Sequence, residues 1–378
     1  MKTTRYIFVL MIYFFGNLLV AQQSNKKEYK LIGYVFGDLM DKAEAPVNAE
    51  KLTHLNYAFA KIEEGKISIA DENDPKRFKK LRSLKSKNPS LKLLISVGGW
   101  ANASKFSKIA ASDSTRAQFA QSTLQFLKKY ELDGIDLDWE SPKNNGASTF
   151  LPQDKENFTL LLAEIRQKLD SFSAKTNHSY LLSVATASNS EYLQNIEISK
   201  IAKNVDFINI MCYDYHGDWD ASTSHHTNLL TSAATTKNQN QSTRLVIKNY
   251  IEAGVAPSKL IIGVPFYGRG WRKVNPENNG LYQPANGQAF SLNYTSLKDS
   301  LRSGKYHRYW DEAAQAPYLW NDVDQIFITY DDPVSIEKKI EFIKTENLGG
   351  AMFWQYHGDD GELLESLFLN LKNENHEK

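Results

Sequence analysis

Cysteine is almost absent from this sequence: Cys212 is the only one among 378 residues. A single thiol cannot form a disulfide within the chain, which excludes a small scaffold held together by disulfides. The adjacent Ile210 and Met211 are apolar, and this favours a buried structural cysteine over a catalytic one. The stability of the folded chain must therefore come from a hydrophobic core.

An excess of charge of one sign is also absent. The chain has 45 lysines and arginines against 44 aspartates and glutamates, a net charge of +1. Because proteins that bind nucleic acids normally carry a basic excess, we expect no nucleic-acid partner. Only 11 prolines and 20 glycines occur, and 42% of the residues are hydrophobic, so the chain is neither disordered nor collagen-like and can fill a large core.

Long apolar runs are missing too, except for one at the N-terminus. Lys2 and Arg5 precede the apolar run 6–15, and residues 19–21 (Leu, Val, Ala) follow it. A basic start, a short apolar stretch and an exit through small residues are typical of a secretory signal peptide. The run is shorter than the about 20 residues of a membrane-spanning helix. We therefore expect residues 1–21 to be a cleaved signal peptide rather than a retained anchor, and the mature chain to be a secreted or periplasmic monomer without membrane attachment.

What is present is a repeated alternation of β-type runs with amphipathic stretches. The β-type runs lie at Lys30–Phe36, Leu55–Ala60, Leu91–Val97, Gly134–Trp139, Tyr180–Ala187, Val205–Tyr213, Leu260–Val264 and Gly350–Trp354. Stretches with apolar residues at helical spacing include Thr115–Tyr130, Lys155–Leu169, Thr243–Ala253 and Ser335–Thr345, with Ser114 as the expected N-cap of the first and Pro333 at the start of the last. Parallel strands need long crossovers, and eight strand–helix units close a (β/α)8 TIM barrel. The predicted fold is therefore α/β, with a barrel over residues 28–374.

One interval breaks this alternation. Residues 265–349 separate the seventh and eighth runs, whereas a βαβ unit needs only about 30 residues. Residues 271–330 are rich in Tyr, Trp, Asn, Gly and Pro and contain no long amphipathic stretch. We therefore predict a small α+β insertion domain at 271–330, between strands 7 and 8 of the barrel.

The most informative segment is the sequence DGIDLDWE at residues 133–140, which ends the fourth run. Because strand side chains alternate between faces, Asp136, Asp138 and Glu140 point the same way, into the barrel. A solvent-facing acidic strand and a metal site are the alternatives, but no clear His or carboxylate cluster on other strand ends completes a coordination shell. We therefore predict no metal and no cofactor. Acids at the C-terminal end of a barrel strand are catalytic candidates.

The spacing of these acids restricts the chemistry. A glycosidase usually places two carboxyl groups about 5 Å or more apart, on opposite sides of the sugar. Asp138 and Glu140 are same-face neighbours on one strand and cannot lie on both sides of the anomeric carbon. Glu140, the outermost, can act as general acid, and the substrate's own 2-acetamido group is the known alternative nucleophile. Asp138 would orient that amide, and Asp136 would exchange a proton with Asp138.

Four further motifs accompany the acidic one, in chain order. They are Ser96-Val97-Gly98-Gly99 on the third run, Met211-Cys212-Tyr213-Asp214 on the sixth, Gly263-Val264-Pro265-Phe266-Tyr267-Gly268-Arg269 on the seventh and Gly350-Ala351-Met352-Phe353-Trp354 on the eighth. Together with Asp133-x-x-Asp136-x-Asp138-x-Glu140 they resemble the motifs of glycoside hydrolase family 18, the chitinases. The resemblance covers nearly the whole mature chain. The stretch after strand seven is similar to the α+β domain that forms one wall of a deep groove in one subgroup of the family.

The resemblance implies roles for particular residues. It implies Glu140 as proton donor, assisted by Asp136 and Asp138, in a retaining hydrolysis of β-1,4-linked N-acetylglucosamine polymers. Chitin or chitooligosaccharides are then the expected partner. Substrate-binding residues follow in the same way: Tyr213 as a donor to the acetamido group, Asp214 on the same group or the adjacent sugar, Met211 within the same motif, and Trp354 as the aromatic floor beneath the sugar. Weaker cleft candidates, with core packing or framework hydrogen bonding as the alternative, are Trp100, Tyr34, Phe59, Tyr267 and Arg269.

Two other functions stay open: a sugar-binding lectin on the same scaffold, and an endo-β-N-acetylglucosaminidase acting on N-glycan cores. Binding-only relatives typically lack the acidic proton donor, and Glu140 is present. The chain departs from the family at Ser141, where an aromatic residue often follows the catalytic glutamate. The adjacent His225 and His226 would not face one way on a strand, so we expect no metal there.

Overall fold

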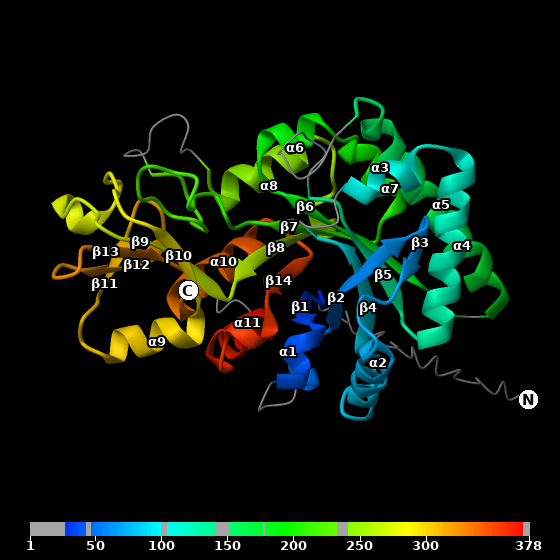
Figure 1. Ribbon diagram of the computed structural model, residues 1–378, viewed down its shortest axis with the longest axis horizontal. Helices are drawn as coiled ribbons and strands as arrows, with labels where there is room; N and C mark the ends of the chain where they lie inside the picture. The colour runs from blue at the N-terminus through cyan, green and yellow to red at the C-terminus, as the bar shows by residue number, and fades with distance from the viewer. Residues whose placement is uncertain are drawn as a thin grey trace, which may run out of the picture.

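The computed structural model describes residues 27–42, 47–99, 104–140, 151–176, 178–232 and 241–372 (Figure 1). Within these residues a parallel barrel is formed by β1 (Lys30–Phe36), β2 (His54–Glu63), β4 (Lys92–Gly98), β5 (Gly134–Asp138), β6 (Leu181–Ala187), β7 (Phe207–Met211), β8 (Leu260–Pro265) and β14 (Gly350–Trp354). Neighbours pair in this order, and β1 pairs with both β2 and β14, which closes the ring. The predicted (β/α)8 barrel is confirmed.

The helices lie outside the barrel, and all those before the C-terminal α11 lie between strands in the chain. They are α1 (Gly37–Lys42), α2 (Asp74–Ser83), α3 (Ser104–Ala110), α4 (Asp113–Tyr130), α5 (Asp154–Thr176), α6 (Ser190–Gln194), α7 (Ile198–Asn204), α8 (Thr243–Glu252), α10 (Pro333–Thr345) and α11 (Glu362–Lys372). Short 3-10 turns lie at Ala49–Lys51, Leu84–Ser86, Pro257–Lys259, Glu277–Gly280 and Tyr356–Gly358, and the short strand β3 (Lys66–Ser68) pairs antiparallel with β2. Over the described ranges, no helix is both long and apolar enough to cross a membrane.

The N-cap of α4 is Ser112, so the prediction of Ser114 was wrong. Ser112 has an extended backbone, and its side chain accepts a hydrogen bond from the backbone N–H of Thr115. The hydroxyl of Thr115 accepts in return from the backbone N–H of Ser112 over 3.1 Å, which completes a capping box. Three possible caps follow one another here, and only the backbone geometry distinguishes them. Pro333 does open α10, with Asp332 as its N-cap.

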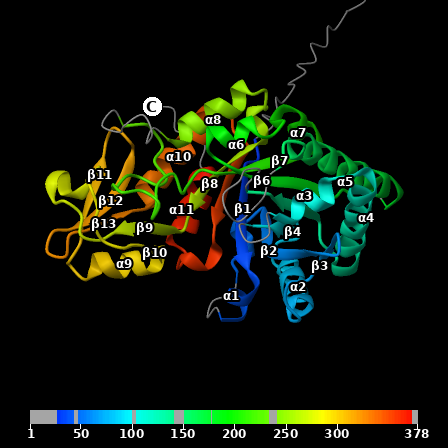
Figure 2. The ribbon, with the colours of Figure 1, turned by 45° about the horizontal axis from the view of Figure 1, so that its top comes forward.

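A second, five-stranded sheet lies between β8 and α10 in the chain. It contains β9 (Tyr267–Trp271), β10 (Ala289–Asn293), β11 (His307–Asp311), β12 (Ala316–Asn321) and β13 (Ile326–Thr329), and helix α9 (Tyr294–Arg302) follows β10. The strands are antiparallel in the order β10-β9-β13-β12-β11. Figures 1 and 2 show this sheet to one side of the barrel. The sheet begins at Tyr267, ahead of the predicted boundary at residue 271. Only Phe266 separates β9 from the barrel strand β8, and no change in composition marks this boundary.

The outward-facing side chains at β5 pack between the barrel and its helices. Ile135, Leu137 and Trp139 are at most 1% exposed. The Trp139 ring stacks on Phe106 of α3 and meets Phe158 of α5 edge-on, with ring centroids 5.1 Å apart in both cases. Burying each such side chain contributes about 1.5–3 kcal/mol to stability. This packing fixes which face of the strand points outward, and the alternating carboxyl groups are left inside.

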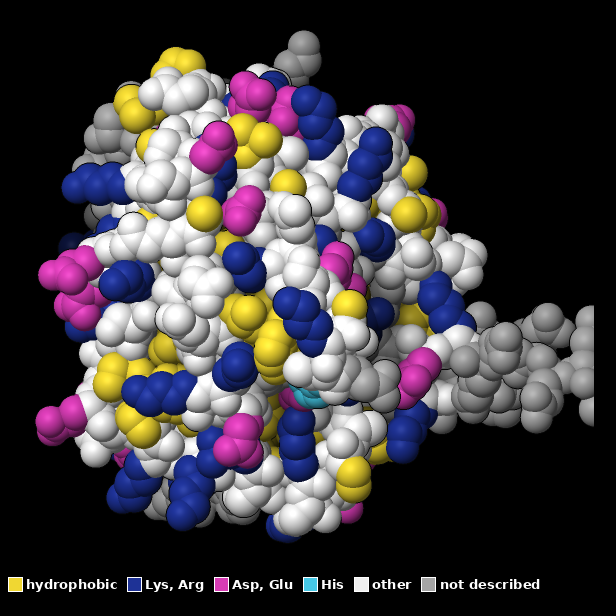
Figure 3. All heavy atoms as spheres, turned by 90° about the vertical axis from the view of Figure 1, so that its right-hand side faces the viewer, with side chains coloured by type: hydrophobic (Ala, Val, Ile, Leu, Met, Phe, Trp, Pro, Cys, Tyr) yellow, Lys and Arg dark blue, Asp and Glu magenta, His cyan; other side chains and the backbone are white. Residues whose placement is uncertain are grey.

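The outer surface over α4 and α5 carries charges of both signs. Figure 3 shows lysine and arginine side chains interspersed with acidic ones on this face. The mixture agrees with the net charge of +1 of the whole sequence.

Candidate active site

A cleft of about 390 Å³ opens at the C-terminal ends of the barrel strands, the end at which barrel enzymes carry their active sites. Of the residues selected from the sequence, those that line it are Tyr34, Phe59, Asp138, Glu140, Met211, Tyr213, Asp214, Tyr267 and Trp354. The remaining lining residues are Phe36, Gly98, Gly99, Ala185 and Met352. Tertiary folding therefore brings segments from β1 to β14 together around the carboxyl groups of Asp138, Glu140 and Asp214.

A larger hollow of about 790 Å³ lies at the opposite end of the barrel, next to the starts of β1 and β2. Its lining includes the lysines Lys27, Lys51, Lys87 and Lys372 beside polar and apolar residues. It contains none of the three acids of β5 and lies at the end that barrel folds use for stability rather than catalysis. We therefore place the candidate site in the smaller cleft.

Asp136 is fully buried and accepts hydrogen bonds from four side chains on other strands. Its Oδ2 accepts from the Tyr34 hydroxyl and from Ser96 Oγ, each at 2.8 Å. Its Oδ1 accepts from Ser183 Oγ at 2.6 Å and from Asn209 Nδ2 at 3.2 Å. Burial raises the pKa of Asp136, and these donors offset part of that rise. The barrel interior thus holds this carboxyl group from four directions.

Asp138 is the next inward-facing residue of β5 and reaches the cleft. It is 4% exposed, and within the described part of the chain its Oδ1 has no hydrogen-bond partner. Burial raises the pKa of Asp138 well above its usual range, and the charges of Glu140 and Asp136 raise it further. Asp138 therefore keeps its proton to a higher pH than an ordinary aspartate, and it presents an unsatisfied oxygen beside the cleft.

Glu140 lies just beyond the end of β5, on the cleft wall. The ladder of β5 ends at Asp138, opposite Gly98 of β4 and Ala185 of β6. The backbone N–H of Gly99 then donates to the Asp138 carbonyl over 3.0 Å. Gly98 has a φ of +117°, and a Cβ there would lie 2.2 Å from that carbonyl oxygen. Only glycine therefore allows β4 to approach the acidic strand this closely.

Trp354 forms an aromatic floor with residues from β1 and β2. Its ring stacks on Phe59 (centroids 5.7 Å apart, planes at 28°) and meets Phe36 edge-on at 4.9 Å. The pairing of β2 with β4 shifts by one residue between Ala58 and Ala60, and this bulge turns Phe59 toward the cleft. Phe36 was missed from the sequence, although it lies two positions after Tyr34 on the same strand and therefore on the same face.

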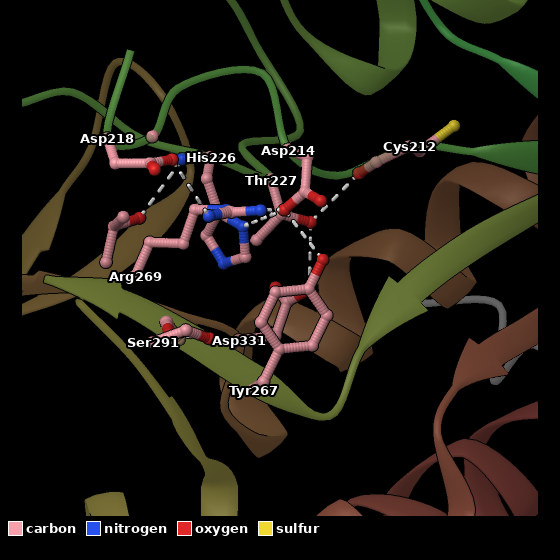
Figure 4. A network of polar contacts seen from close by, with 12 residues as sticks. Cys212, Asp214, Asp218, His226, Thr227, Tyr267, Arg269, Ser291 and Asp331 are labelled. Atoms are coloured by element: carbon pink, nitrogen blue, oxygen red, sulfur yellow. Dashed lines mark hydrogen bonds and ion pairs between the residues drawn. The ribbon is translucent and has the colours of Figure 1, made fainter. Parts of the chain in front are cut away.

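Three side chains surround one oxygen of Asp214, and two of them donate hydrogen bonds to it (Figure 4). Its Oδ1 accepts from Tyr267 Oη at 2.7 Å and from Arg269 Nε at 2.6 Å, and His226 Nδ1 lies 3.5 Å away. Burial alone would raise the pKa of Asp214, but His226 and Arg269 outweigh it and lower the pKa below the usual range. The backbone at Asp214 is left-handed, with a φ of +59°, a conformation that is uncommon outside glycine and often found at functional sites.

Tyr213 points into the cleft beside this carboxylate. Its side chain packs on Gly263, where a Cβ would lie 2.8 Å from the tyrosine ring. Burial raises the pKa of Tyr213 well above its usual range, and the charge of Asp138 adds to the rise. The phenol therefore stays protonated and has a proton that it can donate.

The adjacent histidines contact different partners. His225 Nε2 lies 3.2 Å from Asp311 Oδ2 in the second sheet, whereas His226 faces Asp214. Across the described ranges, no three His, Cys, Asp or Glu side chains are grouped so that they could hold a metal ion. The contact of His226 with Asp214 had no signal in the sequence, because it depends on how the loop after β7 folds back.

The cleft continues along the edge of the second sheet. A hollow of about 310 Å³, lined by Tyr267, Arg269, Trp354, Ser291, Asn293 and Gln355 among others, adjoins it. Arg269 also contacts the ring of Trp219 at 4.8 Å, and Trp219 is 58% exposed. Such an exposed indole beside a cleft can stack on a sugar ring. Trp219, Ser291 and Asn293 were all missed from the sequence, since each lies outside the recognised motifs.

Three expectations fall outside the described residues. They concern Trp100 as a cleft residue, Ser141 after the acidic motif and residues 1–21 as a signal peptide.

Comparisons with known proteins agree on one family. A sequence profile described as "Glycosyl hydrolases family 18" matches residues 12–359. Chitinase A1 of Niallia circulans is 36% identical in an alignment that covers 89% of this chain, and the chain spans 58% of that longer protein. A solved structure described as a glycoside hydrolase family 18 N-acetylglucosaminidase from Paenibacillus barengoltzii is 36% identical, with a TM-score of 0.84 over 91% of this chain and 100% of that one. Human YKL-39, described as a pseudo-chitinase with retained chitooligosaccharide binding properties, is 27% identical, with a TM-score of 0.83 over 92% of this chain and 100% of that one.

Proposed function

The chain belongs to the glycosyl hydrolases of family 18, and on that premise we propose that it hydrolyses β-1,4 bonds between N-acetylglucosamine units, with Glu140 as proton donor. The observation that carries the proposal is the placement of Glu140 and Asp138 beside an aromatic cleft, with Asp136 held beneath them. Chitin or its oligomers are the proposed substrate.

The proposed nucleophile is the carbonyl oxygen of the substrate's own acetamido group. Glu140 donates its proton to the bridging oxygen as the bond from that oxygen to the anomeric carbon breaks. The acetamido oxygen then bonds to the same carbon and closes a cyclic oxazolinium ion. Glu140, now a carboxylate, removes a proton from the water that opens the ring. Two inversions at one carbon give net retention of configuration.

Asp138 is the proposed partner of the acetamido N–H. Its Oδ1 is buried and, among the described residues, unpartnered, so an N–H group entering the cleft would satisfy it. Loss of the Asp138 proton would give a carboxylate that stabilises the positive charge of the ring intermediate. Exchange of that proton with Asp136 stays a prediction.

Tyr213 and Trp354 are the proposed anchors of the sugar in the cleft. The protonated phenol of Tyr213 donates to the acetamido oxygen and aims it at the anomeric carbon. The Trp354 ring, packed by Phe36 and Phe59, supplies a flat apolar surface for the C–H face of the sugar.

Asp214 is a poor alternative as the nucleophile. Its Oδ1 is occupied by Tyr267 and Arg269, and its lowered pKa reflects a carboxylate stabilised by His226 and Arg269. A stabilised carboxylate attacks carbon weakly, because the attack would have to disrupt those hydrogen bonds. This supports the acetamido group of the substrate as the nucleophile. Asp214 then contacts that acetamido group or a neighbouring sugar.

The central experiment compares wild type with Glu140→Gln and Glu252→Gln on chitohexaose. Glu252 pairs with Lys248 on the exposed face of α8, away from the cleft. Glu252→Gln therefore shows the effect of the same substitution outside the candidate site. We expect loss of turnover only in Glu140→Gln, and chitohexaose should still bind to that variant. Wild type that binds but never cleaves chitohexaose would indicate the lectin. Cleavage of N-glycan cores in preference to chitohexaose would indicate the endo-β-N-acetylglucosaminidase.

A second experiment tests the nucleophile. Cellohexaose has the same bond but no acetamido group, so it should resist cleavage. Equal cleavage of both oligomers, or a sugar ester trapped on a carboxyl group of the protein, would contradict the proposed mechanism.

We also propose export of the chain after removal of residues 1–21, and a monomeric mature protein. Sequencing the N-terminus of the natural protein and measuring its mass in solution test both points.

A further inference from the structure

The backbone around the proposed acid lies beyond the last strand pairing of β5. Ladder partners exist for Asp138 on both sides, at Gly98 and Ala185, and the strand ends there. The peptide that joins Trp139 to Glu140 therefore lies just beyond the paired part of β5.

A side chain from α6 binds this peptide. The hydroxyl of Tyr192 donates to the carbonyl oxygen of Trp139 over 3.1 Å. Tyr192 is 3% exposed and is not among the residues that line the cleft. Its own backbone is fixed, because Asn189 caps α6 and accepts from the Tyr192 N–H over 2.8 Å. Through these two hydrogen bonds, Tyr192 connects Asn189, two residues after β6, to the residue before Glu140.

From this arrangement we propose that Tyr192 is a positioning residue for Glu140. Its hydroxyl binds the Trp139 carbonyl just beyond the paired part of β5, and it holds the Trp139–Glu140 peptide so that the carboxyl group of Glu140 meets the bridging oxygen of the substrate. The inference rests on the proposed function of Glu140 and adds a residue outside the recognised motifs.

The chemistry of Tyr192 suits this role. Burial raises the pKa of Tyr192 well above its usual range, and the nearby Tyr250, Asp138 and Glu140 add to the rise. The phenol therefore remains a donor throughout the pH range in which a glutamic acid could act. A displacement of about 1 Å at a reacting group can cost up to a hundredfold in rate, so a single hydrogen bond at this point has a measurable effect.

Tyr250 provides a matched control. It is also a buried phenol at this end of the barrel, and it donates to the carbonyl of Ala187 and to Thr186 Oγ1, each at 2.8 Å. These partners belong to β6, not to the acidic strand. Tyr192→Phe and Tyr250→Phe therefore remove the same hydroxyl from similar surroundings, and only the first removes a bond to the peptide before Glu140.

The experiment measures kcat, KM and the thermal midpoint of both variants and of wild type on chitohexaose. We expect kcat to fall about tenfold in Tyr192→Phe with KM within about twofold of wild type, and both parameters to stay within about twofold in Tyr250→Phe. Both variants should lose similar thermal stability. Chitohexaose should bind equally to Glu140→Gln and to the double variant Glu140→Gln/Tyr192→Phe, because Tyr192 does not contact the sugar.

Wild-type kcat in Tyr192→Phe, or an equal fall in the two phenylalanine variants, would overturn the inference. Weaker binding in the double variant would overturn it as well, because it would show a role in holding the sugar. Failure of the proposed function is a separate outcome: wild type itself would then not cleave chitohexaose, or Glu140→Gln would keep its turnover.

Discussion

The hydroxyl of Tyr34 on β1 lies 2.8 Å from Oδ2 of Asp136 on β5, across the interior of the barrel. The same hydroxyl accepts a hydrogen bond from Asn209 Nδ2 on β7 at 2.9 Å. Tyr34 therefore links β1 to β5, the strand that carries the acids. Its pKa is raised well above the usual range, first by burial and then by Asp136 and Asp138, so it acts as a donor to the carboxyl group.

Removing this hydroxyl should weaken both stability and turnover. In Tyr34→Phe, Asp136 loses one of its donors, and its pKa should rise further. We expect unfolding in urea to show a loss of about 1–2 kcal/mol, and kcat to fall about tenfold. Tyr294→Phe removes a phenol that donates to Glu362 outside the site and should keep wild-type kcat. Equal kcat in the two variants would contradict a role of Tyr34 in the acidic network.

Replacing Asp138 with Asn should lower turnover steeply and raise stability in a pH-dependent way. The raised pKa of Asp138 means that the folded state resists its ionisation more than the unfolded state does, so wild type loses stability as the pH rises above about 4. Asn cannot ionise. The gain in thermal midpoint for Asp138→Asn should therefore grow from pH 4 to pH 8, and binding of chitohexaose should change little. A constant gain across that range would show that Asp138 titrates normally.

Arg269→Gln should destabilise the fold most at neutral pH. The lowered pKa of Asp214 stabilises the folded state above the unfolded pKa of about 3.9, and this contribution is lost as the pH falls through the lowered value. Without Arg269 the contribution shrinks, so the difference from wild type should be largest near pH 7 and should narrow below about pH 4. The exposed pair Arg302–Asp299 supplies a control, Arg302→Gln, for which we expect no such trend. Thermal midpoints at several pH values provide the measurement.

Gly98→Ala should be far more damaging than Gly304→Ala. Both glycines have a positive φ (+117° and +71°), so both variants carry the backbone cost of about 1 kcal/mol or more. At Gly304 no atom lies within 4 Å of the added Cβ, whereas at Gly98 the Cβ would meet the Asp138 carbonyl at 2.2 Å. We expect Gly98→Ala to lose at least about 2 kcal/mol more in urea unfolding, and to lose turnover with it. Equal stability of the two variants would mean that β4 and β5 can separate without consequence.

The barrel and its acidic strand were predictable because their signals are local. Alternation along residues 134–140 separates Ile135, Leu137 and Trp139 from the carboxyl groups, and a strand has no other way to arrange them. Signals that depend on backbone conformation were less reliable. The N-cap of α4 is one example, since Ser112 and Ser114 have the same chemistry and only φ and ψ select between them.

The amino-acid order alone was sufficient for the repeated strand–helix units, the three inward acids and the motifs that resemble the family. It could not identify the groups that meet across the barrel. Ser183 and Asn209, which donate to Asp136, and Tyr192, which donates to Trp139, are 47 to 73 residues from their partners in the sequence. His226 is 12 residues from Asp214. These contacts exist only after the barrel has folded and brought β6, β7 and the segments that follow them together. Periodicity predicts the face of the strand on which a side chain lies. The residue that it contacts on that face depends on strand register and on how the loops fold over the barrel.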